Sequence, residues 1–243
     1  QTLHGTQFEA PEKRRWHTSY YGATSGIGLA LQYHPKRVAG QPMRVGLVGL
    51  GTGTLATYLE RGDYGRFYEI NPQVLDIAST RFTHLTDARQ AGAQIDVSLG
   101  DARIVLERQL AANEAQQFDV LAVDAFSSDS IPIHLLTSQA LDVYQKHMAP
   151  GGVIAIHISN RYLDLGAVVR AVAAAHGYEA NLFVNDNDGA TAVNRSEWVL
   201  LTDNRGFLDN PKVHDAEVAW PADARPPVLW TDDYSALLPV LRF

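Results

Sequence analysis

Apolar runs of strand length alternate along the chain with longer segments in which apolar residues recur at helical spacing. Gly, Pro, Asn or Asp marks many of the boundaries, as is common at strand ends and in turns. The runs predict seven strands, at residues 44–48, 65–70, 95–98, 118–124, 152–158, 181–185 and 197–202. The intervening pattern predicts helices at residues 55–61, 72–80, 102–112, 138–147 and 165–175.

Alternating strands and helices are typical of an α/β protein with a doubly wound, mainly parallel, Rossmann-like sheet. We expect residues 43–243 to form one such domain on the seven strands. Residues 1–42 fall outside the alternation, and we expect them to form an N-terminal extension over the ligand crevice. Ligands of such sheets bind beyond the carboxyl ends of the strands, so the residues after each strand are the candidates for a site.

A glycine-rich loop follows the first predicted strand, with Gly49, Gly51 and Gly53 around Thr52. Glycines here let the backbone turn sharply and let a ligand approach its N–H groups. Glu69 ends the second predicted strand about 20 residues after Gly49, the spacing at which an acid reaches a ribose diol. The loop alone also fits a plain tight turn, but the loop and Glu69 together favour a nucleoside-containing ligand. We therefore interpret the domain as nucleoside-binding, and the family resemblance described below implies that it is also catalytic.

Carboxylates also follow the third and fourth predicted strands. Asp101, beside Ala102, precedes a predicted helix and either caps it or contacts an adenine edge. Asp124 ends a run of buried character, so its charge must face solvent, a partner or a ligand. Asp129 lies close to Pro132, where turn formation explains an Asp nearly as well as chemistry does.

The composition describes one sizeable globular domain: 243 residues, of which 46% are hydrophobic and 19% charged. The net charge of −7, with no compensating run of Lys and Arg, argues against nucleic acid as a partner. The chain has no Cys, which excludes disulfides, thiolate metal sites and cysteine nucleophiles. Its nine His residues form no HxH or HxxxH pair, so we expect no metal.

In this order the motifs resemble the spermidine synthase family, the polyamine aminopropyltransferases, within the class I S-adenosylmethionine-dependent methyltransferase fold. The resemblance runs from about residue 19 to residue 157. The matching segments are the glycine loop at 48–53, the ribose-binding strand end at 68–72, the adenine-binding turn at 100–102 and the active-site loop at 124–132. Residues 18–22 and 230–234 further resemble the synthase-like domains that bacteria often fuse to a membrane-embedded segment.

The resemblance implies a transferase of polyamine biosynthesis that carries an aminopropyl-type group from decarboxylated or intact S-adenosylmethionine to a small amine, with release of methylthioadenosine. It implies Asp124 as the base and Asp129 as a second catalytic contact. The nucleoside-binding residues that it implies are Gly49, Gly51, Thr52, Gly53, Glu69, Ile70, Asp101, Ala102 and Asp124. The substrate-binding residues are Tyr20, Tyr21, Phe126, Ser127, Asp232 and Asp233. Simple packing of the tyrosine pair and an exposed turn at the last two aspartates remain alternatives.

The chain departs from the family in the glycine loop and in the active-site loop. Thr52 stands where aminopropyltransferases carry an Asp that binds the aminopropyl ammonium, and Ala125 and Phe126 lengthen the active-site loop. A methyltransferase, or an enzyme that cleaves or cyclises intact S-adenosylmethionine, is therefore a second hypothesis. Thr52 favours it, because a loop Asp would repel the cofactor's carboxylate. A non-catalytic sensor of a nucleoside or a polyamine is a third hypothesis, and it predicts binding without turnover.

The partner expected from the resemblance is a small-molecule amine. The sequence does not decide whether the protein forms a homodimer. The apolar runs are far shorter than the roughly 20 residues that span a bilayer. We expect a cytoplasmic location, either alone or as the soluble domain of an inner-membrane protein. The chain begins at Gln1 instead of Met, which suggests a trimmed or processed chain.

Overall fold

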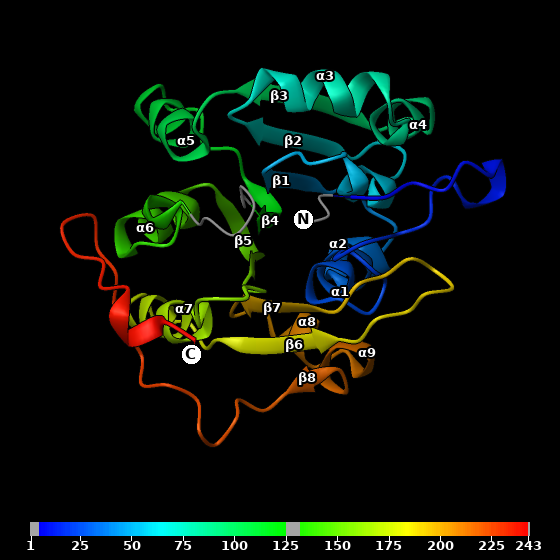
Figure 1. The fold of residues 1–243 in the computed structure, drawn as a ribbon. Coiled ribbons are helices and arrows are strands. Elements are labelled where there is room, and N and C mark those ends of the chain that lie inside the picture. The colour runs from blue at the N-terminus through cyan, green and yellow to red at the C-terminus, as the bar shows by residue number, and fades with distance from the viewer. Residues whose placement is uncertain (1–4, 125–131, 243) are drawn as a thin grey trace.

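The computed structural model describes residues 5–124 and 132–242 (Figure 1). Within these residues eight strands form one sheet, in the order β3-β2-β1-β4-β5-β7-β6-β8. The strands are β1 (Arg44–Val48), β2 (Tyr64–Glu69), β3 (Gln94–Leu99), β4 (Phe118–Val123), β5 (Met148–His157), β6 (Asn181–Asn185), β7 (Ser196–Leu201) and β8 (Glu217–Val218). β1 to β5 are parallel, whereas β7 runs antiparallel to both of its neighbours. The predicted doubly wound, mainly parallel α/β sheet is confirmed.

The centre of the sheet is apolar on both faces. Every residue of β4 is buried, as expected for a parallel strand that is covered from both sides. The eighth strand corrects the predicted number of seven. β8 has two residues, both exposed, and pairs antiparallel with β6 at the sheet edge, so no apolar run marks it in the sequence.

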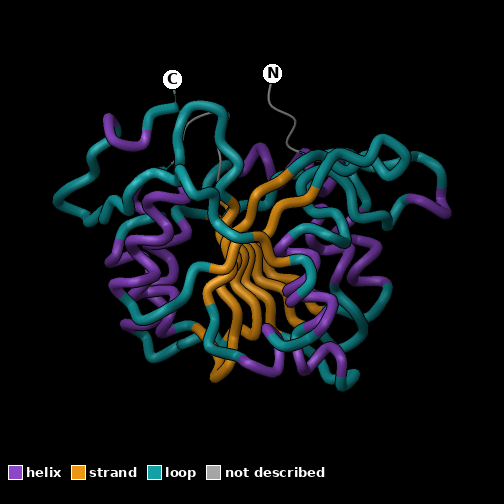
Figure 2. Tube along the Cα trace, turned by 90° about the horizontal axis from the view of Figure 1, so that it is seen from below, coloured by secondary structure: helices purple, strands orange, loops and turns teal. Residues whose placement is uncertain are grey.

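Helices cover both faces of the sheet, as Figure 2 shows. The α-helices are α1 (Gly26–Tyr33), α2 (Pro35–Val38), α3 (Pro72–Thr80), α4 (His84–Gln90), α5 (Ala102–Ala111), α6 (Ser138–Lys146), α7 (Leu165–Ala175), α8 (Arg205–Leu208) and α9 (Pro211–His214). α5, α6 and α7 share one apolar cluster and lie along one side of the sheet in Figure 1. α1, α3 and α4 contribute to the cluster on the opposite face.

The N-terminal segment is more than the predicted extension, because α1 belongs to the core. Ser25 caps α1 by accepting a hydrogen bond from the Gly28 N–H, and Ile27 is fully buried. The helix lies so close to β7 that a Cβ at Gly26 would lie 2.6 Å from the Cβ of Trp198. Close packing of this kind needs a residue without a side chain. Residues 26–33 are therefore part of the domain that was expected to begin at residue 43.

The helix predicted at residues 55–61 is a 3-10 helix, η2 (Thr54–Tyr58), and it ends early. The turn after it is organised by Asp63, whose buried carboxylate accepts hydrogen bonds from the N–H groups of Glu60 and Met43. Arg37 completes this site with an ion pair to Asp63 at 2.5 Å. A buried carboxylate satisfied in this way holds the chain in a turn where the helical pattern would continue.

The burial of His84 makes the fold sensitive to acid. This residue begins α4, is 1% exposed, and has a buried Nε2 with no hydrogen-bond partner in the described residues. Burial lowers the pKa of His84 to about 4. Because the unfolded chain takes up this proton near its ordinary pKa of 6.5, the contribution to stability is present above pH 6.5 and is lost as the pH falls towards 4.

We therefore expect the free energy of unfolding to fall between pH 7.5 and 4.5, with about 2–3 kcal/mol of that fall due to His84. Urea denaturation of the wild type and of His84→Gln at both pH values measures this share. The variant should lose less stability than the wild type over the same interval. An identical loss in both proteins would contradict the assignment to His84.

Candidate functional site

A cavity of about 930 Å³ opens along the edge of the sheet where the parallel strands end. The glycine loop after β1 and the carboxyl ends of β2, β4 and β5 form its wall. The start of β7 joins them, because this antiparallel strand begins at the edge where its neighbour β5 ends. The ligand crevice predicted at this edge thus has a corresponding cavity in the structure.

The glycine loop has the backbone that its sequence predicts. Gly49, Gly51 and Gly53 have φ angles of 95°, 53° and 82°, a left-handed region that other residues rarely adopt. Gly49 and Gly51 line the cavity, whereas Gly53 is the N-cap of η2 and does not line it. Backbone N–H groups of such a turn can approach a ligand closely.

Thr52 lines the cavity, and the N-terminal segment packs against it. Its side chain is 8% exposed, and its Oγ1 lies 2.9 Å from the Oγ1 of Thr54. The backbone of Gly5 passes so close that a Cβ there would lie 2.0 Å from the same oxygen. Residues near the N-terminus therefore pack onto the glycine loop.

Glu69 ends β2 and lines the cavity, but it is 8% exposed and not fully open at the strand tip. Its Oε2 accepts a hydrogen bond from the Leu50 N–H at 3.0 Å, and its Oε1 accepts one from the Asn71 N–H at 2.8 Å. Each carboxylate oxygen keeps a second lone pair. The side chain therefore fixes the glycine loop and can still accept hydrogen bonds from a diol. Ile70, next in the chain, is 68% exposed and adds an apolar surface to the cavity wall.

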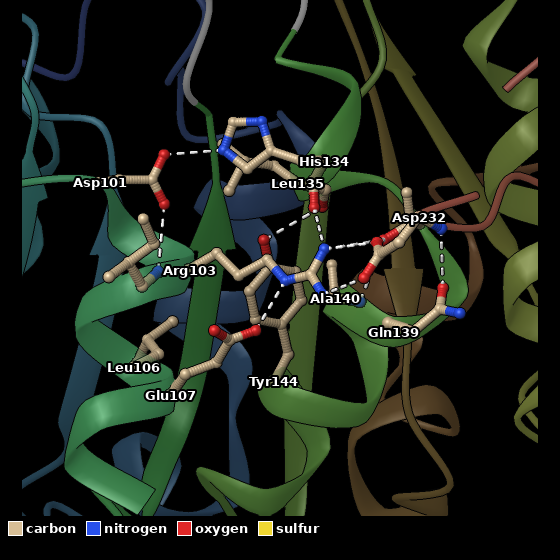
Figure 3. Close-up of polar contacts among 12 residues, drawn as sticks. Asp101, Arg103, Leu106, Glu107, His134, Leu135, Gln139, Ala140, Tyr144 and Asp232 are labelled. Carbon is tan, nitrogen blue, oxygen red and sulfur yellow. Dashed lines mark hydrogen bonds and ion pairs between the residues drawn. The ribbon is translucent and has the colours of Figure 1, made fainter. Parts of the chain in front are cut away.

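Asp101 caps α5, as one of the two roles weighed for it predicts, and its expected contact with an adenine edge stays a prediction. Its Oδ1 accepts a hydrogen bond from the Ile104 N–H at 3.1 Å, which caps α5, and its Oδ2 lies 2.7 Å from the Nε2 of His134 (Figure 3). Asp101, Ala102 and His134 all line the cavity. The carboxylate thus bridges the start of α5 and the segment that precedes α6.

Asp124 is the centre of a hydrogen-bonded group that the sequence analysis found only in part. Its side chain is 10% exposed and lines the cavity. Its Oδ2 accepts a hydrogen bond from the Tyr21 hydroxyl at 2.5 Å, and its Oδ1 lies 2.7 Å from the Nδ1 of His157. The Nε2 of His157 lies 2.8 Å from the Oγ of Ser159, which itself accepts a hydrogen bond from the Glu197 N–H.

Both tyrosines expected at the site line the cavity beside this group. Burial, followed by the charge of Asp124, raises the pKa of Tyr21 well above its ordinary value and also raises that of Tyr20. Tyr21 therefore keeps its proton at neutral pH and remains a hydrogen-bond donor to Asp124. The Tyr20 ring lies 5.4 Å from the His157 ring, centroid to centroid.

His157 is the functional candidate that the sequence analysis missed. It closes the apolar strand β5, directly beside β4, which leads into Asp124. A polar residue at the end of a buried parallel strand, next to a strand that ends in an acid, is the signal that points to it. Parallel neighbours bring their carboxyl ends to the same edge, so these two side chains meet.

Asp232 and Asp233 do not line the cavity. Asp232 is bound by Arg103, with its Oδ1 2.6 Å from Nη1 and its Oδ2 2.5 Å from Nη2 (Figure 3). It also accepts a hydrogen bond from the Thr137 hydroxyl at 2.8 Å. The hydrogen bonds from Arg103 lower the pKa of Asp232. This aspartate fastens the C-terminal segment to α5 and α6. The expected contacts of Asp232 and Asp233 with a substrate stay predictions.

Three of the residues expected at the site, Phe126, Ser127 and Asp129, lie outside the described residues. The expectations for them stay predictions.

Comparison with known proteins places the chain beside polyamine aminopropyltransferases. It is 28% identical over 151 residues to the polyamine aminopropyltransferase of Vibrio vulnificus, a match that covers 61% of this chain and 46% of that protein. It is 27% identical over 117 residues to a probable polyamine aminopropyl transferase of Bifidobacterium longum, covering 46% of this chain and 23% of that protein. The chain therefore spans less than half the length of these curated relatives. No family model matches it.

Among solved structures, the fold is similar to that of the spermidine synthase from Thermotoga maritima. The TM-score is 0.54 at 14% identity, and the match covers 84% of this chain and 66% of that one. The predicted fold class and the predicted resemblance to polyamine aminopropyltransferases are confirmed. In the described residues no helix has the length and apolarity needed to cross a membrane. The narrower likeness to membrane-fused domains stays a prediction.

Proposed function

We propose that the protein is a spermidine synthase-like transferase. It moves an aminopropyl-type group from a sulfonium nucleoside to a small amine and releases methylthioadenosine. The observation that carries the proposal is the position of Asp124, a nearly buried carboxylate in the same cavity as the glycine loop and Glu69. The curated relatives, named as polyamine aminopropyltransferases, support it.

The residues at the end of the cavity that holds the glycine loop fit a nucleoside. Glu69 keeps a lone pair on each oxygen for the two ribose hydroxyls, and Gly49 and Gly51 leave the loop backbone open to a ligand. Ile70, which is exposed, and the side chain of Asp101 provide an apolar surface and an acceptor for the base. When bound, decarboxylated S-adenosylmethionine supplies a carbon activated by the adjacent positive sulfur.

Asp124 provides the acid–base chemistry of the transfer. The acceptor nitrogen, once deprotonated, forms a bond to the activated carbon while the carbon–sulfur bond breaks. The electron pair of that bond goes to sulfur, which leaves as neutral methylthioadenosine. Asp124 takes the proton from the acceptor ammonium and holds the amine close to the carbon.

Tyr21 and His157 act as positioning residues for Asp124. Each binds a different carboxylate oxygen, so the side chain has one orientation, and each oxygen keeps a lone pair for the amine. Ser159 fixes the His157 ring from its other nitrogen. This chain of hydrogen bonds holds the base in place while the substrates exchange.

Thr52 favours a second candidate, an enzyme that uses intact S-adenosylmethionine. Its buried hydroxyl is neutral and bonded to Thr54, so it offers no ion pair to the ammonium of an aminopropyl group. It also offers no repulsion to a carboxylate at that position.

The first experiment incubates the purified chain with decarboxylated or intact S-adenosylmethionine, with and without a panel of primary amines, and measures methylthioadenosine. We expect methylthioadenosine to appear with the decarboxylated compound, and only when an amine is present. Amine-independent release from intact S-adenosylmethionine would move the assignment to a cleaving or cyclising enzyme. Tight nucleoside binding without any product would favour the sensor hypothesis.

A further inference from the structure

Three arginines line the cavity beyond Asp124, at the end opposite to the glycine loop. Arg161 follows β5, Arg195 precedes β7, and Arg242 lies near the C-terminus. Because the strands at this edge run in the order β1, β4, β5 and β7, the cavity leads from the glycine loop past Asp124 to these residues. We name Arg161, Arg195 and Arg242 the arginine end.

Backbone hydrogen bonds fix the chain at these three exposed arginines. The Asn160 carboxamide accepts hydrogen bonds from the N–H groups of Tyr162 and Leu163, which shapes the turn that carries Arg161. The N–H of Arg242 donates to the Tyr162 carbonyl at 2.7 Å and so fixes the C-terminal segment to the same turn. The N–H of Arg195 donates to the Asn187 side chain at 2.8 Å.

The arginine end carries a net positive charge, although the net charge of the whole protein is −7. Glu197 is the one carboxylate among the described cavity residues at this end, and two of the arginines already share it. Arg195 lies 2.9 Å from its Oε1, and Arg242 lies 3.8 Å from its Oε2. Arg195 also lies 4.0 Å from Asp186, which is 97% exposed and does not line the cavity. Arg161 makes no ion pair with any described residue.

A polyamine is a poor match for this surface. Its second ammonium would lie among guanidinium groups, and juxtaposed like charges weaken binding and exclude a partner. Arginine, by contrast, presents a planar fork that matches the two oxygens of a carboxylate. An acceptor with an amine at one end and a carboxylate at the other would satisfy Asp124 and the arginine end together.

The spacing along the sheet edge separates this site from the co-substrate. Neighbouring strands lie about 4.8 Å apart, so β5 is about two spacings from β1 and one from β4. A short acceptor whose amine lies at Asp124 reaches the arginine end. The amino-acid arm of a nucleoside bound at the glycine loop would have to pass the position of the acceptor amine to reach it.

We propose that the acceptor is an amino-acid-like amine whose carboxylate binds Arg161, with Arg195 and Arg242 beside it, in place of a polyamine. The inference rests on the proposed transfer, since it names the amine used in that reaction. The acceptor nitrogen takes the aminopropyl group, its proton goes to Asp124, and methylthioadenosine leaves with the electron pair of the broken carbon–sulfur bond. The carboxylate takes no part in the bond changes.

The test compares two acceptors of equal chain length, 4-aminobutanoate and 1,4-diaminobutane, by calorimetric titration into protein saturated with methylthioadenosine. Wild-type protein should bind 4-aminobutanoate at least about tenfold more tightly. Arg161→Gln should weaken that binding by about 10- to 100-fold, and Arg161→Glu should reverse the preference towards the diamine. Arg108→Gln, at an exposed arginine of α5 outside the cavity, is the matched control and should bind as the wild type does.

Equal or tighter binding of 1,4-diaminobutane by the wild type would overturn the inference, and so would unchanged affinities in Arg161→Gln. A parallel titration with intact and decarboxylated S-adenosylmethionine separates the two sources of a carboxylate. If Arg161→Gln weakens only the intact compound, the arginine end serves the co-substrate and the inference fails. Binding needs no turnover, so the inference is tested even if methylthioadenosine release is absent, an outcome that contradicts the proposed transfer alone.

Discussion

Replacement of Asp124 by asparagine is expected to lower kcat by about 10²- to 10⁴-fold, the range that general acid–base groups contribute. The amide cannot take a proton from the acceptor ammonium. The site itself should persist, because the amide oxygen accepts the Tyr21 hydrogen bond and the amide nitrogen donates to the Nδ1 of His157 in its other tautomer. Affinity for methylthioadenosine should stay within about threefold of the wild type, since Asp124 acts on the amine.

Steady-state release of methylthioadenosine and calorimetric binding of the same product measure the two quantities separately. Asp203→Asn is the matched control: it makes the same chemical change at an exposed aspartate that does not line the cavity. That variant should keep the wild-type rate. Full activity in Asp124→Asn, or an equal loss in both variants, would contradict the role of Asp124 as the base.

Glu69→Gln is expected to weaken nucleoside binding by about 10- to 100-fold, as for the loss of hydrogen bonds to a charged group. Both oxygens of Glu69 accept backbone N–H groups, from Leu50 and from Asn71. A glutamine must turn its amide N–H₂ towards one of those donors. The substitution therefore disturbs the glycine loop as well as the expected contact with the ribose, and a fall in affinity alone does not separate the two effects.

Binding of two nucleosides distinguishes the disturbed loop from the lost ribose contact. Adenosine and 2′,3′-dideoxyadenosine differ in the two hydroxyl groups that Glu69 is proposed to bind. Wild-type protein should prefer adenosine, and the preference should shrink towards unity in Glu69→Gln, whereas a disturbed loop would weaken both ligands equally. Calorimetric titration of both proteins with both nucleosides completes this cycle. A preserved preference in the variant would assign Glu69 to the loop and remove it from the ribose site.

The local pattern of the sequence predicted much of the fold. The bounds of β1, β6, α3 and α7 agree with the predicted ranges, because each element is delimited by its own apolar run and by turn or capping residues. The elements that were missed lack such a signal. α1 lies in a segment without strand–helix alternation, and its role in the core follows from contact with β7, far away in the chain. β8 has only two residues, both exposed.

The residues of the candidate site also fall into those that the sequence identifies and those that only the structure reveals. The glycines of the loop, Glu69 and Asp124 could be identified from the chain alone, because a strand followed by a turn places the next residue at a known edge of a parallel sheet. The detailed roles could not. Glu69 binds the loop backbone, and Asp232 pairs with Arg103, 129 residues away in the chain.

Residue order thus carried the information for the type of fold, for the edge of the sheet where the cavity opens, and for the glycine loop and Glu69 that we propose to bind a nucleoside. Those properties depend on short-range periodicity and on the conformations that individual residues tolerate. The pairing of His157 with Asp124 and the gathering of Arg161, Arg195 and Arg242 around one cavity arise only in the folded chain. Such contacts join segments that are remote in sequence, and their distances are set by how strands and loops pack against one another in three dimensions.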